Sequence, residues 1–364
     1  TVWDGTTEAV TPVNNQIHIQ NPKQLAYIAQ QSKAGQSYEG ITIILDANLD
    51  LGSVNWTPIG SMTYPFKGNF EGNHHEIKNL KITTNTGIDD LGLFGYCYNS
   101  TIKNFYLNNV YIKIDKYATS PRINGYGGVI GLADGIILEN VHASDLYIHS
   151  DIYGMTALTG GLIGTIRGTA HKFANILNCS VSNLYSINYP NSAGGLIGEV
   201  EIIGVPLIMK NSFIKDSTLV DGTYTGGLSG WIGIKDETAY FENCYASNLK
   251  ITNNGITTGL LLGRTLRNGN KILKNCYGYG TYENKIGNND LLFGLVGIAQ
   301  NSSLEFENCY YPSRLEAVGT IDSAFNYSLI NTEGLADSVI KNNITQTPNL
   351  VNKLNDWVKA QPNS

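Results

Sequence analysis

The feature that most constrains the fold is a short glycine-rich phrase that returns seven times. It reads AGGLIGEV at residues 193–200. The last glycines of the copies are Gly95, Gly131, Gly164, Gly198, Gly230, Gly263 and Gly297, at intervals of 32 to 36 residues. A period this constant over about 200 residues is typical of a solenoid, in which each repeat packs on the next one.

An asparagine keeps step with the glycine phrase. In each copy an apolar residue stands two positions before it and a small or apolar residue directly after it. These asparagines are Asn104, Asn140, Asn178, Asn211, Asn243, Asn275 and Asn308, with a weaker precursor at Asn79. Apolar residues at alternate positions before the asparagine predict a half-buried strand that ends at a corner. Asparagine tolerates the left-handed backbone conformation and stacked amides can bond to one another, so we expect this column to turn the chain in every coil.

Such a corner would point the residue that follows each asparagine into the solenoid. The predicted interior column is Phe105, Val141, Cys179, Ser212, Cys244, Cys276 and Cys309. Cys97 brings the number of cysteines to five, and an odd number without CxxC spacing argues against a disulfide framework or a zinc site. We expect buried structural thiols, because free cysteine is among the most buried residue types.

The spacing predicts an all-β chain: a parallel β-helix solenoid with coils of about 33 residues, expected to be right-handed. Each period would hold three short strands, in seven or eight coils. Propeller blades and leucine-rich repeats fit the spacing less well. The stretches 21–34 and 349–360 have helical apolar spacing and are predicted to be short capping helices at the two ends, which cover unpaired strand edges.

This organisation divides the chain into three parts. Residues 1–60 form an N-terminal segment with a capping helix and lead-in strands, and residues 61–316 form the β-helix of repeats. Residues 317–364 form a C-terminal segment with the second capping helix, which in a longer protein would lead into a further domain.

The charge balance excludes some function classes. The formal net charge is −6 and the sequence has no basic stripe, so we expect no nucleic-acid partner. The sequence also has no apolar run of 18 residues, so we expect no transmembrane segment in this chain.

Two short motifs bear on metal binding. DANLDLG carries oxygen side chains at Asp46, Asn48 and Asp50, as a calcium loop does, but its glycine comes one residue late and no Glu completes the site. We interpret it as a strand and a turn. Adjacent His74 and His75 in a strand face opposite ways, which suits a structural role better than a shared metal, so we predict neither a metal nor another cofactor.

The acidic residues are scattered along the chain. They include Asp89, Asp90, Asp115, Asp134, Asp145, Asp151, Asp216 and Asp236, and none recurs in register in two neighbouring coils. Polysaccharide hydrolases and lyases need clustered carboxylates. We therefore predict no catalytic residue, although a cluster that forms only in three dimensions stays open.

An outward column is predicted one residue after the interior column. It comprises Tyr106, His142, Ser180, Phe213, Tyr245, Tyr277 and Tyr310. The last four would stack into a flat aromatic stripe about 15 Å long at the spacing of strands in a sheet. Exposed aromatic rows suit sugars or protein partners, so Phe213, Tyr245, Tyr277 and Tyr310 are the candidate ligand-binding residues. The alternative is that these rings only stabilise the sheet or lie under loops.

The GGLIG phrase at this period, followed by the Asn-Cys step, resembles the GLUG-motif repeat of bacterial surface proteins. That motif also occurs in the non-catalytic part of some immunoglobulin A protease precursors. Residues 17–60 and 66–82, with LDL, WTPIG and FKGNFEG in this order, are similar to the leader block of GLUG proteins from Bacteroides-type bacteria. The resemblance covers about residues 15–310. It implies an exported, surface-attached β-helix and no established chemistry.

The leading hypothesis is a non-enzymatic bacterial cell-surface or extracellular protein that serves adhesion or ligand binding. Its partner would be a host protein, a matrix protein or a glycan. The chain begins without Met or a leader, so we expect the export leader to precede it. The alternatives are a carbohydrate-active lyase or hydrolase on the same fold, or a passive spacer region of a larger surface protein.

Overall fold

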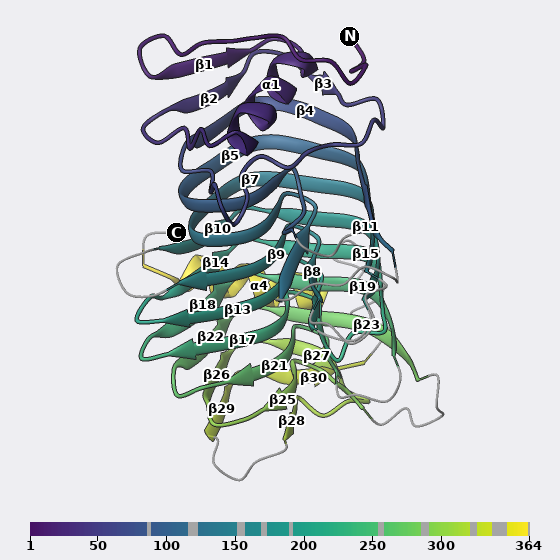
Figure 1. The fold of residues 1–364 in the computed structure, drawn as a ribbon. Helices are drawn as coiled ribbons and strands as arrows, with labels where there is room; N and C mark the ends of the chain where they lie inside the picture. The colour runs from purple at the N-terminus through teal and green to yellow at the C-terminus, as the bar shows by residue number, and fades with distance from the viewer. Residues whose placement is uncertain are drawn as a thin grey trace.

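The computed structural model describes residues 1–85, 89–115, 123–150, 157–168, 173–188, 192–253, 258–284, 291–320, 326–336 and 348–362. Over these residues the chain forms a parallel β-solenoid whose coils stack from the N-terminus to the C-terminus (Figure 1). The prediction of an all-β solenoid with coils of roughly 33 residues is confirmed. About six regular coils form, fewer than the seven or eight predicted, and the described part of the small second sheet likewise has six strands.

Each regular coil contributes three strands to one large sheet. The equivalent strands of successive coils stack into three groups, which we call the first, second and third walls. The first wall consists of β9 (Ile163–Gly168), β13 (Ile197–Ile203), β17 (Ser229–Lys235), β21 (Leu262–Leu266), β25 (Val296–Ala299) and β28 (Val318–Thr320). The second wall consists of β10 (Ala174–Leu177), β14 (Leu207–Lys210), β18 (Thr238–Glu242), β22 (Asn270–Lys274), β26 (Ser303–Glu307) and β29 (Asn326–Ile330). The third wall consists of β11 (Ser180–Asn188), β15 (Phe213–Val220), β19 (Tyr245–Asn253), β23 (Tyr277–Asn284), β27 (Tyr310–Pro312) and β30 (Glu333–Leu335).

The N-terminal strands extend the same walls. They are β1 (Gln16–Ile19), β2 (Thr42–Leu45), β3 (Leu49–Asp50), β4 (Asn69–Thr84), β5 (Phe94–Ile114) and β7 (Ile130–Ser150). The long strands β5 and β7 run along all three walls. Parallel pairing crosses both predicted segment boundaries, since β2 pairs with β4 and β26 pairs with β29.

A fourth strand per coil, which the sequence did not predict, forms the small second sheet. Its members are β6 (Asn124–Gly127), β8 (Ala157–Gly160), β12 (Ser192–Gly194), β16 (Tyr224–Gly226), β20 (Thr258–Gly259) and β24 (Leu292–Phe293). The second sheet packs against the first wall through backbone atoms at the recurrent glycines. A Cβ atom on Gly164 would lie 2.2 Å from the Tyr126 backbone N, and one on Gly198 would lie 2.7 Å from the Thr159 backbone O. The repeated glycine therefore gives the two sheets room for close approach.

The recurrent asparagines lie at the corner between the second and third walls. All seven have a left-handed backbone, with φ between 51° and 62°. Their amides form a ladder: Asn140 donates to Asn104 (2.9 Å), Asn178 to Asn140, Asn243 to Asn211 (2.9 Å), Asn275 to Asn243 (2.7 Å) and Asn308 to Asn275 (2.8 Å). Each asparagine thus turns its own coil, and the amides link the coils in two runs, from Asn104 to Asn178 and from Asn211 to Asn308.

A second left-handed corner, absent from the prediction, falls five residues later, within the third wall. Its residues are Asn79, Asn109, Asp145, Asn183, Asp216 and Asn248. Here Asn109 donates to Asn79 (2.6 Å) and Asn248 donates to Asp216 (2.7 Å). The assignment of Asn79 as a precursor of the first column was therefore wrong. In that coil Asn73 and His74, both with positive φ, make the first corner.

The interior contains the column that follows the first corner. Phe105, Val141, Ser212 and the column's four cysteines are fully buried, as is Cys97, and all five thiols are free. Burial raises the pKa of Cys179 to about 12, so the thiol stays protonated at neutral pH.

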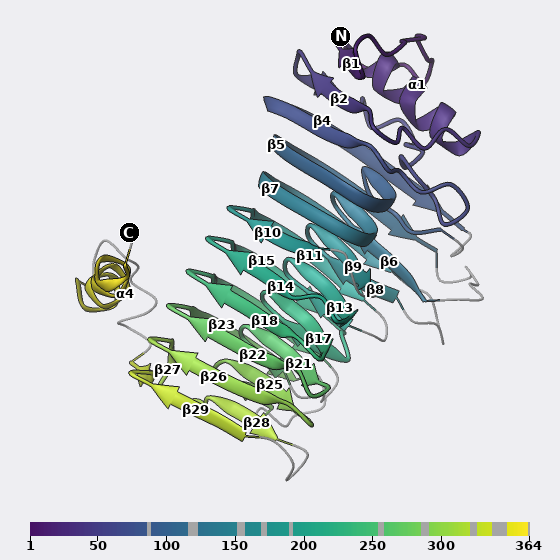
Figure 2. The same ribbon diagram turned by 90° about the vertical axis from the view of Figure 1, so that its left-hand side faces the viewer.

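Helices lie near both ends. α1 (Pro22–Lys33) begins after Asn21, whose side chain accepts from the Gln24 backbone N–H (3.1 Å), and buries Leu25 and Ile28. α4 (Pro348–Ala360) lies against the outer side of the third wall, at the left of Figure 2. It leaves the last strand of the second wall, β29, with all five residues exposed.

Replacing Gly164 by Ala should destabilise the protein by about 3 kcal/mol or more, because the added methyl group meets backbone that cannot rotate away. Gly168, in the same strand, is the matched control. Its nearest neighbour is Asp134 Oδ1 at 3.4 Å, so Gly168→Ala should be neutral or slightly stabilising. Urea denaturation of both variants measures the difference, and equal losses would contradict the packing described.

Replacing Asn243 by Ala should cost about 2–3 kcal/mol, because it removes two ladder bonds and puts a residue that tolerates the left-handed region less well than Asn at this corner. Asn243→Gly loses the same bonds without the backbone penalty, so it should cost about 1 kcal/mol less than the Ala variant. Thermal unfolding of both variants measures the two stability losses. A larger loss for the Gly variant than for the Ala variant would contradict the left-handed corner at Asn243.

Candidate binding surface on the third wall

The outer side of the third wall carries the predicted aromatic column, and its rings stack along the ladder. Phe213 and Tyr245 have ring centroids 4.6 Å apart at an interplanar angle of 4°, and Tyr245 and Tyr277 are 4.9 Å apart at 7°. Tyr277 is in register with Tyr310 of the next coil. The parallel register places each ring over the equivalent position of its neighbour, as the repeat predicts.

The expectation that all four rings lie exposed was wrong, because α4 covers the last two. Tyr277 and Tyr310 are only 4% and 2% exposed and form a cluster with Leu350 of α4. Burial raises the pKa of Tyr310 to about 12. Polar contacts also hold the helix: Trp357 Nε1 donates to Glu307 (2.8 Å), and Lys353 Nζ lies 5.6 Å from the centroid of the Tyr310 ring.

A second aromatic column, which the sequence analysis missed, lies farther along the same wall and closer to the N-terminus. Tyr111 and Tyr147 stack at 5.0 Å and 9°, and Tyr147 and Tyr185 at 6.0 Å and 5°. Tyr111 is 38% exposed and Tyr185 is 44% exposed. Each tyrosine follows a residue of the second corner by two positions, in the triplets NVY, DLY and NLY, and this recurrence could have revealed the column.

The first column contributes another exposed ring to this region. Tyr106 is 47% exposed and stacks on His142, with centroids 5.6 Å apart. His142 shares a 2.8 Å hydrogen bond with the Ser180 hydroxyl, and burial lowers the pKa of its imidazole, so the ring is neutral at pH 7. We call Tyr106, His142, Tyr111, Tyr147 and Tyr185 the tyrosine platform.

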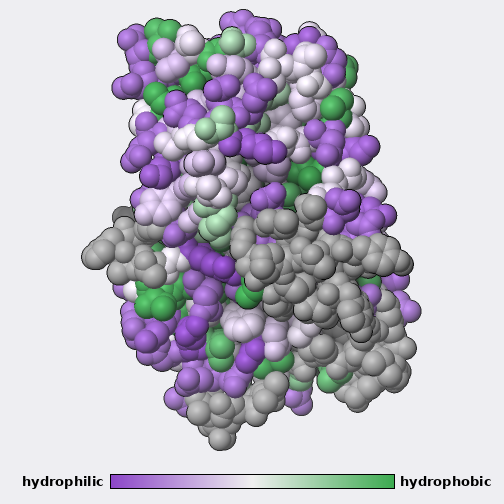
Figure 3. Space-filling view, in the orientation of Figure 1, coloured by the Kyte–Doolittle hydropathy of each residue, from purple (hydrophilic) through white to green (hydrophobic). Residues whose placement is uncertain are grey.

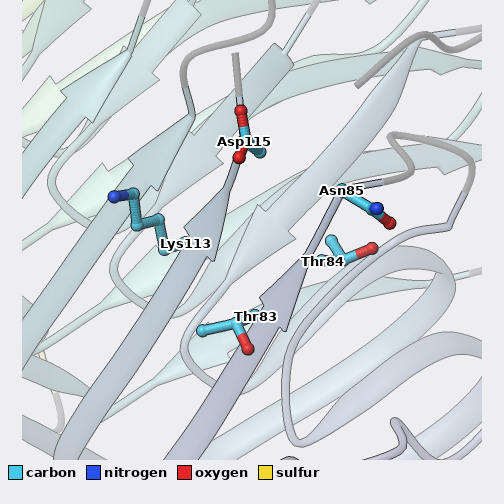
Figure 4. Close-up of a pocket in the computed structure, with 5 residues that line it drawn as sticks. All are labelled: Thr83, Thr84, Asn85, Lys113 and Asp115. Atoms are coloured by element: carbon cyan, nitrogen blue, oxygen red, sulfur yellow. The ribbon is translucent and has the colours of Figure 1, made fainter. Parts of the chain in front are cut away.

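Two shallow polar depressions adjoin the platform. One, of about 470 Å³, is lined by Tyr111 together with Lys81 and Asn109. The other, of about 410 Å³, lies where β4 and β5 end. Figure 4 shows Lys113 and Asp115 at the end of β5, beside Thr83, Thr84 and Asn85 at the end of β4. Together with the platform they form a surface that offers both aromatic edges and hydrogen-bonding groups.

On the face seen in Figure 3, hydrophobic side chains are scattered singly among hydrophilic ones. Scattered apolar residues are normal for a protein surface and indicate no particular partner. The tyrosine platform on the third wall is therefore a more distinctive feature than the general polarity of the surface.

Four of the scattered acidic residues make hydrogen bonds that belong to the structure of the solenoid. Asp145 and Asp216 lie in the second corner ladder, and Asp90 accepts from the Gly125 backbone N–H (2.8 Å). Asp236 accepts from the Asn268 side chain (3.0 Å). Asp151 lies outside the described residues.

The calcium-like motif and the histidine pair form ordinary structural contacts. Asp46 pairs with His18 (3.0 Å), Asn48 bonds to His75 (3.1 Å), and Asp50 accepts from the Gly52 backbone N–H (2.9 Å). Within the part of the chain that the structure describes, no group of three or more His, Cys, Asp or Glu side chains could hold a metal ion. The described helices also include none that is long and apolar enough to cross a membrane.

No protein-family model matches the chain, and the comparison with curated proteins gives no match. Among solved structures, the chain is similar to a crystal structure from Bacteroides ovatus named "putative immunoglobulin A1 protease". The two are 15% identical, with a TM-score of 0.47 over 94% of this chain and 87% of the other.

Proposed function

We propose that this chain is a ligand-binding protein of the adhesion type and that the tyrosine platform is its contact surface. The observation that carries the proposal is the row of three parallel tyrosines, two of them more than one-third exposed, fixed on a rigid sheet. A protein normally buries such rings or spaces them apart, and exposed aromatic groups are enriched where partners bind.

The geometry determines how a partner would meet the platform. Since the rings stack on one another, a partner would meet their edges, and the Tyr147 hydroxyl already shares a 3.1 Å hydrogen bond with His149. An extended glycan or a protein surface can pack along this row and hydrogen-bond to the hydroxyls. The sheet holds the rings in place before binding, so little side-chain entropy is lost when the partner arrives.

The proposed setting is the bacterial cell surface or the extracellular space, with the chain as a GLUG-type repeat protein. The glycine phrase, the Asn-Cys step and the leader block support this proposal by resemblance. A host protein, a matrix protein or a glycan would then be the partner.

Replacing Tyr111 and Tyr185 by Ser should weaken binding to a partner found on a glycan and matrix-protein array by about tenfold or more. Both side chains are partly exposed, so the fold should persist. Tyr327→Ser is the matched control, because Tyr327 is 50% exposed but lies on β29 of the second wall. Surface plasmon resonance measures the affinities, and unchanged binding by the Tyr111/Tyr185 variant would sink the proposal.

A further inference from the structure

The outer side of the first wall holds a carboxyl group with no bonding partner. Glu199 on β13 is 8% exposed, and within the described part of the chain its carboxyl group makes no hydrogen bond or ion pair. Burial raises the pKa of Glu199, and the charges of Arg167 and Arg267 only partly oppose this rise. Most polar atoms in largely buried side chains have a hydrogen-bond partner, which makes Glu199 an unusual feature of this wall.

Hydrogen-bond donors without partners lie in the coils that follow Glu199. Trp231 lies directly beside it in the sheet register, and Arg264 lies beside Trp231 in the next coil. Among the described residues, Trp231 Nε1, Arg264 Nε and Arg267 Nε are buried and lack an acceptor. One row across three coils thus presents an unpaired acid next to unpaired donors.

Neighbouring contacts hold these groups in place. The Arg264 guanidinium lies 4.7 Å from the ring centroids of both Tyr224 and Trp231, and it donates to the Tyr224 hydroxyl (2.8 Å) and to Gln300. A cation close to two aromatic rings is stabilised by both of them. The donors therefore have fixed positions, as a preorganised site requires.

The opposite side of the cluster is fixed by charge. Arg267 pairs with Glu201. A Cβ atom on Gly233 would lie only 2.4 Å from the Glu201 Oε2, so the glycine leaves room for this side chain. The turn that carries Arg267 is held by Lys271, a fully buried residue that the sequence analysis missed. Its Nζ donates to the carbonyls of Leu266 (2.8 Å), Arg267 (2.9 Å) and Gly269 (2.7 Å). The Arg267 and Glu201 side chains are 38% and 26% exposed, so the cluster opens to solvent at this rim.

We propose that Glu199, Trp231 and Arg264 form a saccharide-binding subsite on the first wall. The ligand has to donate to Glu199 and accept from Trp231 Nε1 and Arg264 Nε, which lie in successive coils beside the Tyr224 and Trp231 rings. Neighbouring hydroxyl groups of a sugar do both, and the apolar face of a sugar ring packs on aromatic side chains. A phosphate or a carboxylate accepts only, and it would leave Glu199 unsatisfied. The subsite lies on a different wall from the tyrosine platform and does not depend on it.

The test is an array of neutral oligosaccharides, followed by titration of the strongest neutral binder with wild type, Glu199→Gln and Trp231→Phe. Glu199→Gln keeps the shape but removes the carboxylate acceptor, and Trp231→Phe keeps an aromatic ring but removes the donor. Each should weaken binding by about tenfold, while Glu305→Gln on β26 should leave binding unchanged.

A stability readout separates binding from folding. The folded pKa of Glu199 lies above its ordinary value of 4.5, so the native state retains a proton that the unfolded chain loses. Wild type should therefore lose stability relative to Glu199→Gln as the pH rises above 4.5. The variant should be at least as stable as wild type at pH 7 while binding sugar more weakly.

Three results would overturn the proposal. Wild type could bind no neutral oligosaccharide, or both the Glu199→Gln and Trp231→Phe variants could bind like wild type. Binding could also be lost only in the Tyr111/Tyr185 variant, in which case the sugar binds the tyrosine platform instead.

Discussion

The structure depends on backbone-to-backbone contact between the second sheet and the first wall. At the recurrent glycines the two sheets approach so closely that a Cβ atom would lie within 2.2 Å of a backbone atom at Gly164. Because each regular coil has this contact, each places a glycine at the same position, and the glycine therefore recurs with the period of the coils. The contact fixes where the chain folds back from the second sheet into the first wall, and the rest of the coil extends from that point.

The asparagine corners provide the complementary constraint. A left-handed φ turns the chain from the second wall to the third, and the ladder of amides links consecutive coils. These two backbone requirements explain why glycine and asparagine recur, whereas the outward positions vary freely. Function can therefore reside on the walls without altering the solenoid, and both proposed binding surfaces lie at outward positions of the walls.

The sequence predicted what the backbone repeats. The period, the left-handed asparagines and the interior column of cysteines could be predicted because stacking requires similar residues at equivalent positions of every coil. The small second sheet was missed because its short strands contain the same Gly and Thr residues as a turn. The cover over Tyr277 and Tyr310 was missed because α4 follows more than thirty residues later, and amphipathic spacing does not say which surface a helix meets. Glu199 was missed because the candidate site it forms also needs Trp231 and Arg264. These residues come from two other coils, and only the register of the sheet brings them beside it.

A crystal structure of the chain tests the central claim most directly. We predict a second sheet in backbone contact with the first wall at Gly164 and Gly198, and a left-handed φ at each of the seven recurrent asparagines. A structure in which side chains separate the two sheets at these glycines, or in which the asparagines lie within extended strands, would contradict it.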